Sequence, residues 1–287
     1  MSIVTRFAPS PTGYLHLGHA FAALTAWGRA RAAGGRFLLR VEDIDPTRCR
    51  PGFAAAIQED LAWLGIDWDG DVRVQSAHLP EYRAVLDSLA RRGLLYPCFC
   101  TRAAIAREVA GAGAAPQGPD GVPLYPGTCR ALSPAARAAR IAAGEAYGLR
   151  LDMARAIAAV AVVLSFREET GGDIVCHPER FGDVVLGRKD APASYYLCVT
   201  HDDAAQGVTL VTRGEDLRPA TDLHRLLQAL MGWPAPVYAH HRLLTDPAGR
   251  RLAKRDGAMA LRALRAAGVA PADVRARSGW QDPAGIA

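Results

Sequence analysis

Buried apolar segments alternate with helical segments at the start of the chain, and this alternation restricts the fold more than any other feature. Ser2–Ala8 and Arg36–Asp43 are apolar enough to form buried strands. Between them, the residues after Gly18 carry apolar side chains at helical spacing and end at a pair of glycines. Two more amphipathic helices are predicted over 52–65 and 80–93. An order of strand, helix, strand and helix predicts an α/β fold around a parallel sheet.

The pattern is interrupted between Phe99 and Gly148, where Gly111–Pro126 is rich in glycine and proline and lacks periodicity. We expect an inserted subdomain there, so that the chain divides into the first half of a nucleotide-binding domain (1–97), the inserted subdomain (98–190), the second half of the domain (191–257) and a short helical segment (258–287). The later elements are predicted as strands over 159–166, 181–188, 207–217 and 236–244, a helix over 219–232 and a basic loop over 245–257.

The composition excludes several classes of protein. Half of the 287 residues are hydrophobic and periodic segments recur throughout, which excludes a disordered chain. The longest apolar run, Ala156–Leu164, is too short to cross a bilayer. The N-terminus lacks the pattern of a signal peptide, so we expect a cytoplasmic protein without a membrane partner. A monomer is the default expectation. The net charge of +5 favours an anionic partner only slightly.

The segment Arg6–His19, RFAPSPTGYLHLGH, joins the first predicted strand to the first predicted helix. Its two prolines hold the chain extended, and the helix then begins near Leu17 with His16 and His19 at its mouth. A helix N-terminus at the carboxyl edge of a parallel sheet favours phosphate, and Gly18 allows a close approach. The two histidines can donate hydrogen bonds to a phosphate whose charge grows during transfer. An isolated pair of histidines at this spacing is more often a capped helix with two surface side chains.

The whole segment resembles the HIGH motif of class I aminoacyl-tRNA synthetases, in the form of the glutamyl/glutaminyl group. Three further segments occur in that family's order: Arg40–Arg48 (RVEDIDPTR), Gly207–Leu217 (GVTLVTRGEDL) and Gly249–Gly257 (GRRLAKRDG), the last of which is similar to the KMSKS loop. The resemblance implies a Rossmann-type fold in which an amino acid reacts with ATP, accompanied by Mg²⁺, to form an aminoacyl adenylate. It implies that His16, His19 and Lys254 are catalytic and that ATP is bound by His16, Gly18, His19, Leu252 and Lys254.

The KMSKS-like loop departs from the family's pattern at two positions. Ala253 stands where serine is more common, and Arg251 stands where lysine is more common. Lys254, the position implied to contact phosphate, is kept. The departures therefore bear on the fine adjustment of the loop and not on the reaction.

Charge alone restricts which amino acid this chain can select. Glutamate carries two carboxylates and one ammonium, so its pocket should offer arginines and one acid. Arg6 and Arg213 stand at ends of strands that would meet at the carboxyl edge of the sheet, and Glu42 can accept the α-ammonium. The resemblance implies that glutamate is bound by Arg6, Phe7, Ala8, Pro9, Ser10, Glu42, Tyr195 and Arg213. Tyr195, and not its neighbour Tyr196, is placed by counting back from the segment HDDAAQGVT.

The six cysteines do not predict a disulfide framework in a chain without an export signal. Three of them form a group, because Cys98 and Cys100 are followed after a loop by Tyr125 and Cys129. Three thiolates could bind zinc, for which a closed tetrahedral site needs a fourth ligand; three reduced cysteines in a loop are the alternative. The C-x-C and Y-x-x-x-C pattern resembles the zinc site of the short glutamyl-queuosine tRNA(Asp) synthetases. That resemblance implies one structural Zn²⁺ bound by Cys98, Cys100, Tyr125 and Cys129.

The end of the chain resembles the same short synthetases, because only 30 residues follow Gly257 and we expect no anticodon-binding domain. The resemblance implies activation of L-glutamate without tRNA, followed by transfer to queuosine in the anticodon loop of tRNA(Asp). The alternatives are a truncated glutamyl-tRNA synthetase that charges tRNA(Glu), a HIGH-type nucleotidyltransferase, and a non-catalytic RNA-binding paralogue. Arg6, Glu42 and Arg213 together argue against the nucleotidyltransferase, and the intact catalytic residues argue against the non-catalytic paralogue.

Overall fold

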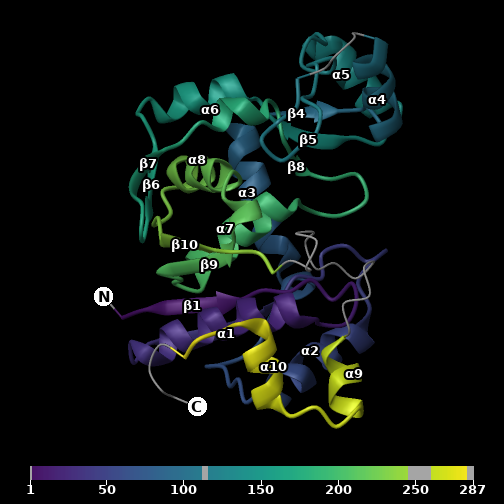
Figure 1. Cartoon of the computed structure of the whole chain (residues 1–287). Coiled ribbons are helices and arrows are strands. Elements are labelled where there is room, and N and C mark those ends of the chain that lie inside the picture. Colours follow the sequence, from purple (N-terminus) through teal and green to yellow (C-terminus); the bar gives the residue numbers. More distant parts are fainter. Residues whose placement is uncertain (1, 112–115, 245–259, 283–287) are drawn as a thin grey trace.

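The computed structural model describes residues 2–111, 116–244 and 260–282. The first strands, β1 (Val4–Phe7), β2 (Arg36–Val41) and β3 (Arg73–Val74), form a parallel sheet in the order β1-β2-β3. The connection from β1 to β2 is helix α1 (Leu17–Ala32), and α2 (Pro51–Trp63), with proline in its first turn, follows β2. This arrangement confirms the predicted α/β order at the start of the chain (Figure 1).

A second sheet continues beside β1. It has the order β7-β6-β10-β9, in which β9 (Leu210–Gly214), β10 (Val237–His241) and β6 (Ser165–Glu168) are parallel and β7 (Gly172–Val175) is antiparallel to β6. β1 and β9 lie side by side, and the N–H of Thr209 donates to the carbonyl of Val4 (Figure 1). The carboxyl ends of β1, β2, β9 and β10 therefore meet along one edge, where ligands bind in folds of this type.

A third sheet, of the order β4-β5-β8, is antiparallel and lies apart from β1 and α1 (Figure 1). It consists of β4 (Leu95–Cys98), β5 (Gly148–Leu151) and β8 (Val185–Gly187). Helices α4 (Arg102–Gly111) and α5 (Pro134–Ala142) belong to the same part of the chain. The range 98–190 thus contributes to two sheets, because β6 and β7 pair within the sheet of β9 and β10.

The remaining helices cover the sheets and complete two apolar cores. One core gathers residues of α3 (Leu79–Arg91), α6 (Met153–Val160), α7 (Tyr195–Ala205) and α8 (Thr221–Met231). The other packs α1 and α2 against α9 (Leu261–Ala266) and α10 (Pro271–Ser278), with Leu261 and Val274 fully buried. The predicted short helices of the last segment are confirmed. Among the described helices, none has the length and apolar character needed to span a membrane.

The strand predicted over 159–166 is only partly correct. Its first residues, Ala159 and Val160, end α6, which begins where the side chain of Asp152 caps the N–H of Arg155. The helix ends at Ala161, whose φ of 56° is left-handed, and Val162 and Val163 are exposed before β6 begins at Ser165. Helices α4, α5, α6 and α7 were not predicted. The loop predicted over 245–257 lies outside the described residues.

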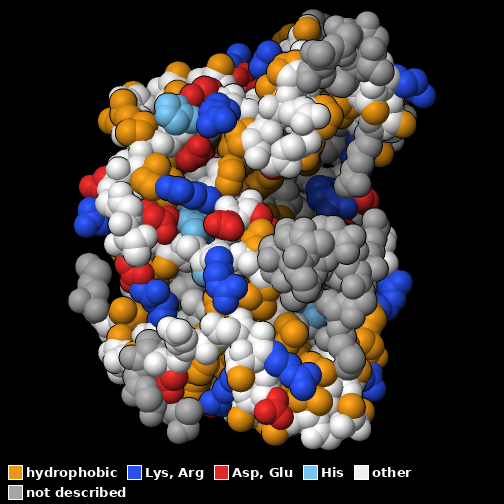
Figure 2. Space-filling model, in the orientation of Figure 1, with side chains coloured by type: hydrophobic (Ala, Val, Ile, Leu, Met, Phe, Trp, Pro, Cys, Tyr) orange, Lys and Arg blue, Asp and Glu red, His pale blue; other side chains and the backbone are white. Residues whose placement is uncertain are grey.

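Basic and acidic side chains lie interspersed over the described part of the face shown in Figure 2. This distribution is what a net charge of only +5 leads one to expect.

Candidate active site

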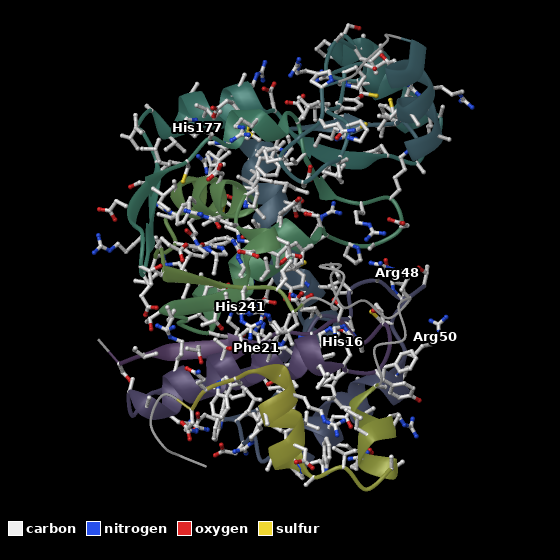
Figure 3. The ribbon with its side chains drawn as sticks, viewed as in Figure 1. His16, Phe21, Arg48, Arg50, His177 and His241 are labelled. Carbon is white, nitrogen blue, oxygen red and sulfur yellow. The ribbon has the colours of Figure 1, made fainter. Side chains whose placement is uncertain are left out.

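A cavity of about 540 Å³ lies at the edge where the parallel strands of the first two sheets end. It is bounded by the chain after β1, the first turns of α1, Glu42 after β2, the start of α7, the end of β9, and residues His241–Leu244. Figure 3 shows Phe21 of α1 close to His241 of β10, and their ring centroids are 5.1 Å apart. The structure brings together here all the described residues that the sequence assigns to glutamate or ATP, namely Arg6, Phe7, Ala8, Pro9, Ser10, His16, Gly18, His19, Glu42, Tyr195 and Arg213.

His16 and His19 form a reciprocal cap at the N-terminus of α1. The Nδ1 of His16 accepts from the N–H of Gly18 at 3.1 Å, and the Nδ1 of His19 accepts from the N–H of His16 at 3.2 Å. A neutral imidazole that accepts at Nδ1 carries its proton at Nε2, so both rings are hydrogen-bond donors at Nε2. A Cβ atom at position 18 would lie only 3.0 Å from the ring of His16, which explains the glycine. The cap thus fixes both the tautomer and the orientation of the two rings.

Arg6 is buried, and a carboxylate partner fixes its position. Its Nε and one terminal nitrogen donate to the two oxygens of Asp203 at 2.9 and 3.3 Å, and its other terminal nitrogen donates to the carbonyl of Thr212. Asp203 also pairs with the buried Arg40 at 2.9 Å. The two arginines hold the pKa of Asp203 down to about 2, against the effect of its burial. The charge of Arg6 is therefore largely balanced within the protein.

Arg213 is equally buried but has neutral partners. Its guanidinium donates to His240 Nε2 at 3.2 Å, His224 Nδ1 at 3.1 Å and the Thr221 hydroxyl at 2.6 Å. No carboxylate of the described residues forms an ion pair with it. One N–H on each terminal nitrogen remains after these bonds, enough for two parallel bonds to one carboxylate. The cavity therefore contains a fixed cation whose charge the surrounding side chains do not neutralise.

Glu42 is the acidic counterpart in the same cavity. Only 7% of the residue is exposed, and its contact with Arg40 is long, at 3.4 Å. Burial raises the pKa of Glu42 to about 7, and Arg40 and Arg6 only partly oppose this. A buried carboxylate with a raised pKa is stabilised in its ionised form when a ligand places a cation beside it.

Tyr195 and Tyr196 begin α7 and differ in where they lie. Tyr195 lines the cavity, whereas the hydroxyl of Tyr196 donates to Asp120 at 3.1 Å and the residue is not part of the lining. The sequence-based choice of Tyr195 over its neighbour thus agrees with the geometry.

Lys254 and Leu252, the remaining predicted ATP contacts, lie outside the described residues, as do Arg251 and Ala253. Of the described residues on either side of this range, Leu244 lines the cavity and Ala260 pairs with the cavity residue His16 across an isolated β-bridge.

The predicted metal ligands also lie together, in the part of the chain that begins at the end of β4 and outside the cavity. The sulfur atoms of Cys98, Cys100 and Cys129 lie within 4.8 Å of one another, and the Tyr125 hydroxyl is 3.4 Å from the sulfur of Cys100. Three sulfurs and one phenolic oxygen at these separations fit the donor set of a tetrahedral zinc site. None of the six cysteines, all of which are described, forms a disulfide.

The surroundings act differently on two of these thiols: burial raises the pKa of Cys100 to about 11, whereas the pKa of Cys129 is lowered. Burial opposes ionisation of Cys129, but bonds from the Tyr125 hydroxyl and the N–H of Phe99 outweigh it and lower the pKa of that thiol. Arg150 donates from Nε to the sulfur of Cys98 at 3.2 Å and lies over the ring of Tyr125. Arg150, absent from the sequence-based predictions, thus supports two of the four predicted ligands.

Sequence reasoning also missed the residues that support the two cavity arginines. They are Asp203, Thr221, His224, His240 and Glu168. Asp203 and its neighbour Asp202 are adjacent acids of α7, and both are buried, but the sequence does not indicate that burial. The others carry no spacing pattern that links them to Arg213.

Three comparisons with known proteins bear on this site. Residues 2–283 match the model of the family described as tRNA synthetases class I (E and Q), catalytic domain. The chain is 52% identical to the Glutamyl-Q tRNA(Asp) synthetase of Rhodobacter capsulatus over 95% of this chain and 98% of that protein. It is 47% identical to the protein of the same name from Nocardia farcinica, over 94% of this chain and 82% of that protein.

Solved structures are similar as well. A glutamate tRNA ligase from Elizabethkingia meningosepticum, in complex with its amino acid, aligns with a TM-score of 0.75 and 29% identity over 90% of this chain. This chain spans about half, 53%, of the length of that ligase.

Proposed function

The chain belongs to the class I tRNA synthetases for glutamate and glutamine, and we propose that it attaches glutamate to queuosine in the anticodon loop of tRNA(Asp). It is a ligase of that family, and its relatives support glutamate-tRNA-ligase-like activity with tRNA, glutamate and ATP as substrates. The finer proposal is that glutamate is activated without tRNA and that queuosine is the acceptor. The relatives in Rhodobacter and Nocardia carry a name that states this acceptor tRNA.

The observation that carries the proposal is the pair of unmatched charges in one cavity. Arg213 presents a cation without a carboxylate among the described residues, and Glu42 presents an acid whose pKa burial raises to about 7. Glutamate supplies the carboxylate and the ammonium that these two groups lack. We assign Arg6 and Arg213 to the carboxylates of glutamate and Glu42 to its α-ammonium. The hydroxyls of Ser10 and Tyr195 would complete the polar contacts.

The first chemical step joins glutamate to ATP. An oxygen of the α-carboxylate attacks the α-phosphorus, the bond from that phosphorus to the bridging oxygen breaks, and pyrophosphate leaves. The Nε2 protons of His16 and His19 would stabilise charge on the phosphates from the helix side, and Lys254 would do so from the opposite side. Mg²⁺ would accompany ATP. In the second step a hydroxyl of queuosine attacks the activated carbonyl, loses its proton and releases AMP.

A structural zinc ion is a separate proposal. Cys98, Cys100, Cys129 and Tyr125 would bind it, and Arg150 would orient the first and last of these ligands. Such an ion would fix the antiparallel part of the chain, where the buried apolar cluster around Phe99 is small. We also propose that the protein acts as a monomer in the cytoplasm, where its tRNA is found.

The test is transfer of labelled glutamate, in the presence of ATP, to purified tRNAs. We expect label on queuosine-containing tRNA(Asp) and none on tRNA(Glu) or on tRNA(Asp) that lacks queuosine. Pyrophosphate exchange that depends on glutamate should proceed without any tRNA. Label on tRNA(Glu) would support instead the activity in the name of the Elizabethkingia ligase. Exchange without transfer to any of these tRNAs would leave activation standing and refute the proposed acceptor.

A further inference from the structure

We propose that Glu168 and His240 are positioning residues that hold Arg213 in place for a glutamate carboxylate. The inference rests on the proposed function, because it assigns Arg213 to glutamate. Neither residue lines the cavity, and neither was predicted from the sequence.

Three neighbouring strands supply the three residues. Glu168 ends β6, His240 lies on β10 and Arg213 on β9, and β10 runs between the other two. His240 and Arg213 are direct partners in the parallel register. We call the hydrogen-bonded series from Glu168 through His240 to Arg213 the relay. It depends on sheet pairing, which brings residues far apart in the chain into contact.

The hydrogen bonds of His240 admit one tautomer only. The carboxylate of Glu168 accepts from the backbone N–H of His240 at 3.0 Å and from its Nδ1 at 2.6 Å. Because a carboxylate only accepts, Nδ1 carries the proton and Nε2 of the neutral ring is an acceptor. The Nε–H of Arg213 donates to that nitrogen at 3.2 Å. Glu168 thus directs the unprotonated Nε2 of His240 toward the Nε–H of Arg213.

A neutral relay orients the guanidinium without cancelling its charge. Arg6 shows the alternative, because its direct pair with Asp203 balances the cation. A carboxylate bonded directly to Arg213 would compete with a carboxylate of the substrate. Burial and the nearby Arg213 lower the pKa of His240 to about 4, against the effect of Glu168, so the ring is neutral at physiological pH. The imidazole therefore separates the fixed acid from the cation that the ligand needs.

The first test is E168Q, which removes one acceptor and adds a donor. The amide cannot accept from both the backbone N–H and Nδ1 with separate oxygens, so one bond breaks or the ring adopts the other tautomer. The other tautomer places a proton at Nε2 against the Nε–H of Arg213. We expect the KM for glutamate in pyrophosphate exchange to rise about ten-fold, the size of one lost bond to a charged group, with the KM for ATP unchanged.

The matched control is E169Q, the same change at the next residue. Glu169 pairs with Arg29, away from Arg213, and its variant should keep the wild-type KM for glutamate. A second variant, H240F, keeps an aromatic ring beside Tyr238 and removes both ring nitrogens. It reports on the relay where E168Q does not fold, and it too should raise the KM for glutamate selectively.

The outcomes separate this inference from the proposed function. Wild-type protein without glutamate-dependent exchange would refute both. Active wild-type protein, with the KM for glutamate unchanged in E168Q and H240F, would overturn the positioning role alone. Equal rises in the KM for glutamate and ATP, together with a lower melting temperature, would also overturn it, because they indicate general loss of structure.

Discussion

Replacement of Glu42 by glutamine should stabilise the protein while removing its proposed activity. Glu42 is buried in the cavity, and its pKa of about 7 stands well above the usual 4.5. The folded state therefore binds this proton more tightly than the unfolded state does. The contribution of Glu42 to stability is fully present below pH 4.5, is lost as the pH rises from 4.5 to about 7, and stays absent above that, because only the folded state buries the charged carboxylate.

The size of the effect follows from the pKa. A shift from 4.5 to about 7 corresponds to roughly 3 kcal/mol of unfolding free energy above pH 7. E42Q cannot ionise, so it should be more stable than the wild type by up to about 3 kcal/mol at pH 8 and by close to nothing at pH 4. Urea unfolding at pH 4, 6 and 8 measures this difference. E59Q is the control, because the side chain of Glu59 is exposed and pairs with Arg265.

The same variant should lose glutamate-dependent pyrophosphate exchange, since the α-ammonium would no longer meet a carboxylate. A gain in stability joined to a loss of activity is the signature of a charged group kept for a ligand. The reasoning is refuted if E42Q is less stable than the wild type at pH 8. It is refuted equally if the gain is the same at pH 4 and pH 8, because the gain would then have no connection with ionisation.

Three further predictions concern pH and the metal. The KM of the wild type for glutamate should rise as the pH falls below about 7, because the ammonium binds to ionised Glu42; pyrophosphate exchange from pH 6 to 8.5 measures this. D60N should be more stable than the wild type by up to roughly 3 kcal/mol at pH 8 and equally stable at pH 3. The reason is that burial raises the pKa of Asp60 to about 6 and both of its oxygens lack hydrogen bonds. Equal stability of the two proteins in urea unfolding at pH 8 would contradict this. Purified protein should contain about one zinc per chain by elemental analysis. C129S should lose the zinc and melt at a lower temperature, whereas C176S, which lies outside the cluster, should retain it. Wild-type protein without zinc would refute the site.

The sequence predicted the parts of the fold and the site that depend on contiguous residues. The strand, turn and helix from Ser2 onward follow from apolar spacing, two prolines and glycine, so the location of His16 and His19 at a helix mouth was predictable. Arg6 and Arg213 are the next-to-last residues of β1 and β9, Glu42 directly follows β2, and parallel strands end at one edge. Their gathering in one cavity thus follows from topology, while the role of each stays a prediction.

The supporting residues could not be predicted, because they depend on register and on distant pairing. His240 meets Arg213 only because β10 pairs with β9 without an offset of one residue, and Glu168 arrives from a strand that no periodicity marked. The run AVAVVLSF was misread for a different reason. Its β-branched residues favour a strand, but the cap at Asp152 starts a helix that continues to Val160.

The buried charges around the cavity separate into two kinds, and the separation explains why so polar a core is tolerated. Arg6 and Arg40 share the carboxylate of Asp203, Arg40 also lies 3.8 Å from Asp202, and these pairs join β1, β2 and α7. Arg213 and Glu42 are not neutralised in this way, and each has the environment that makes a ligand of opposite charge most favourable. The first kind mainly holds the walls of the cavity in place, although Arg6 also lines the cavity and is assigned to a carboxylate of glutamate, and the second kind favours a ligand of opposite charge. Selection of an amino acid with charges at both ends requires the two kinds to remain distinct, which is what a neutral imidazole between Glu168 and Arg213 achieves.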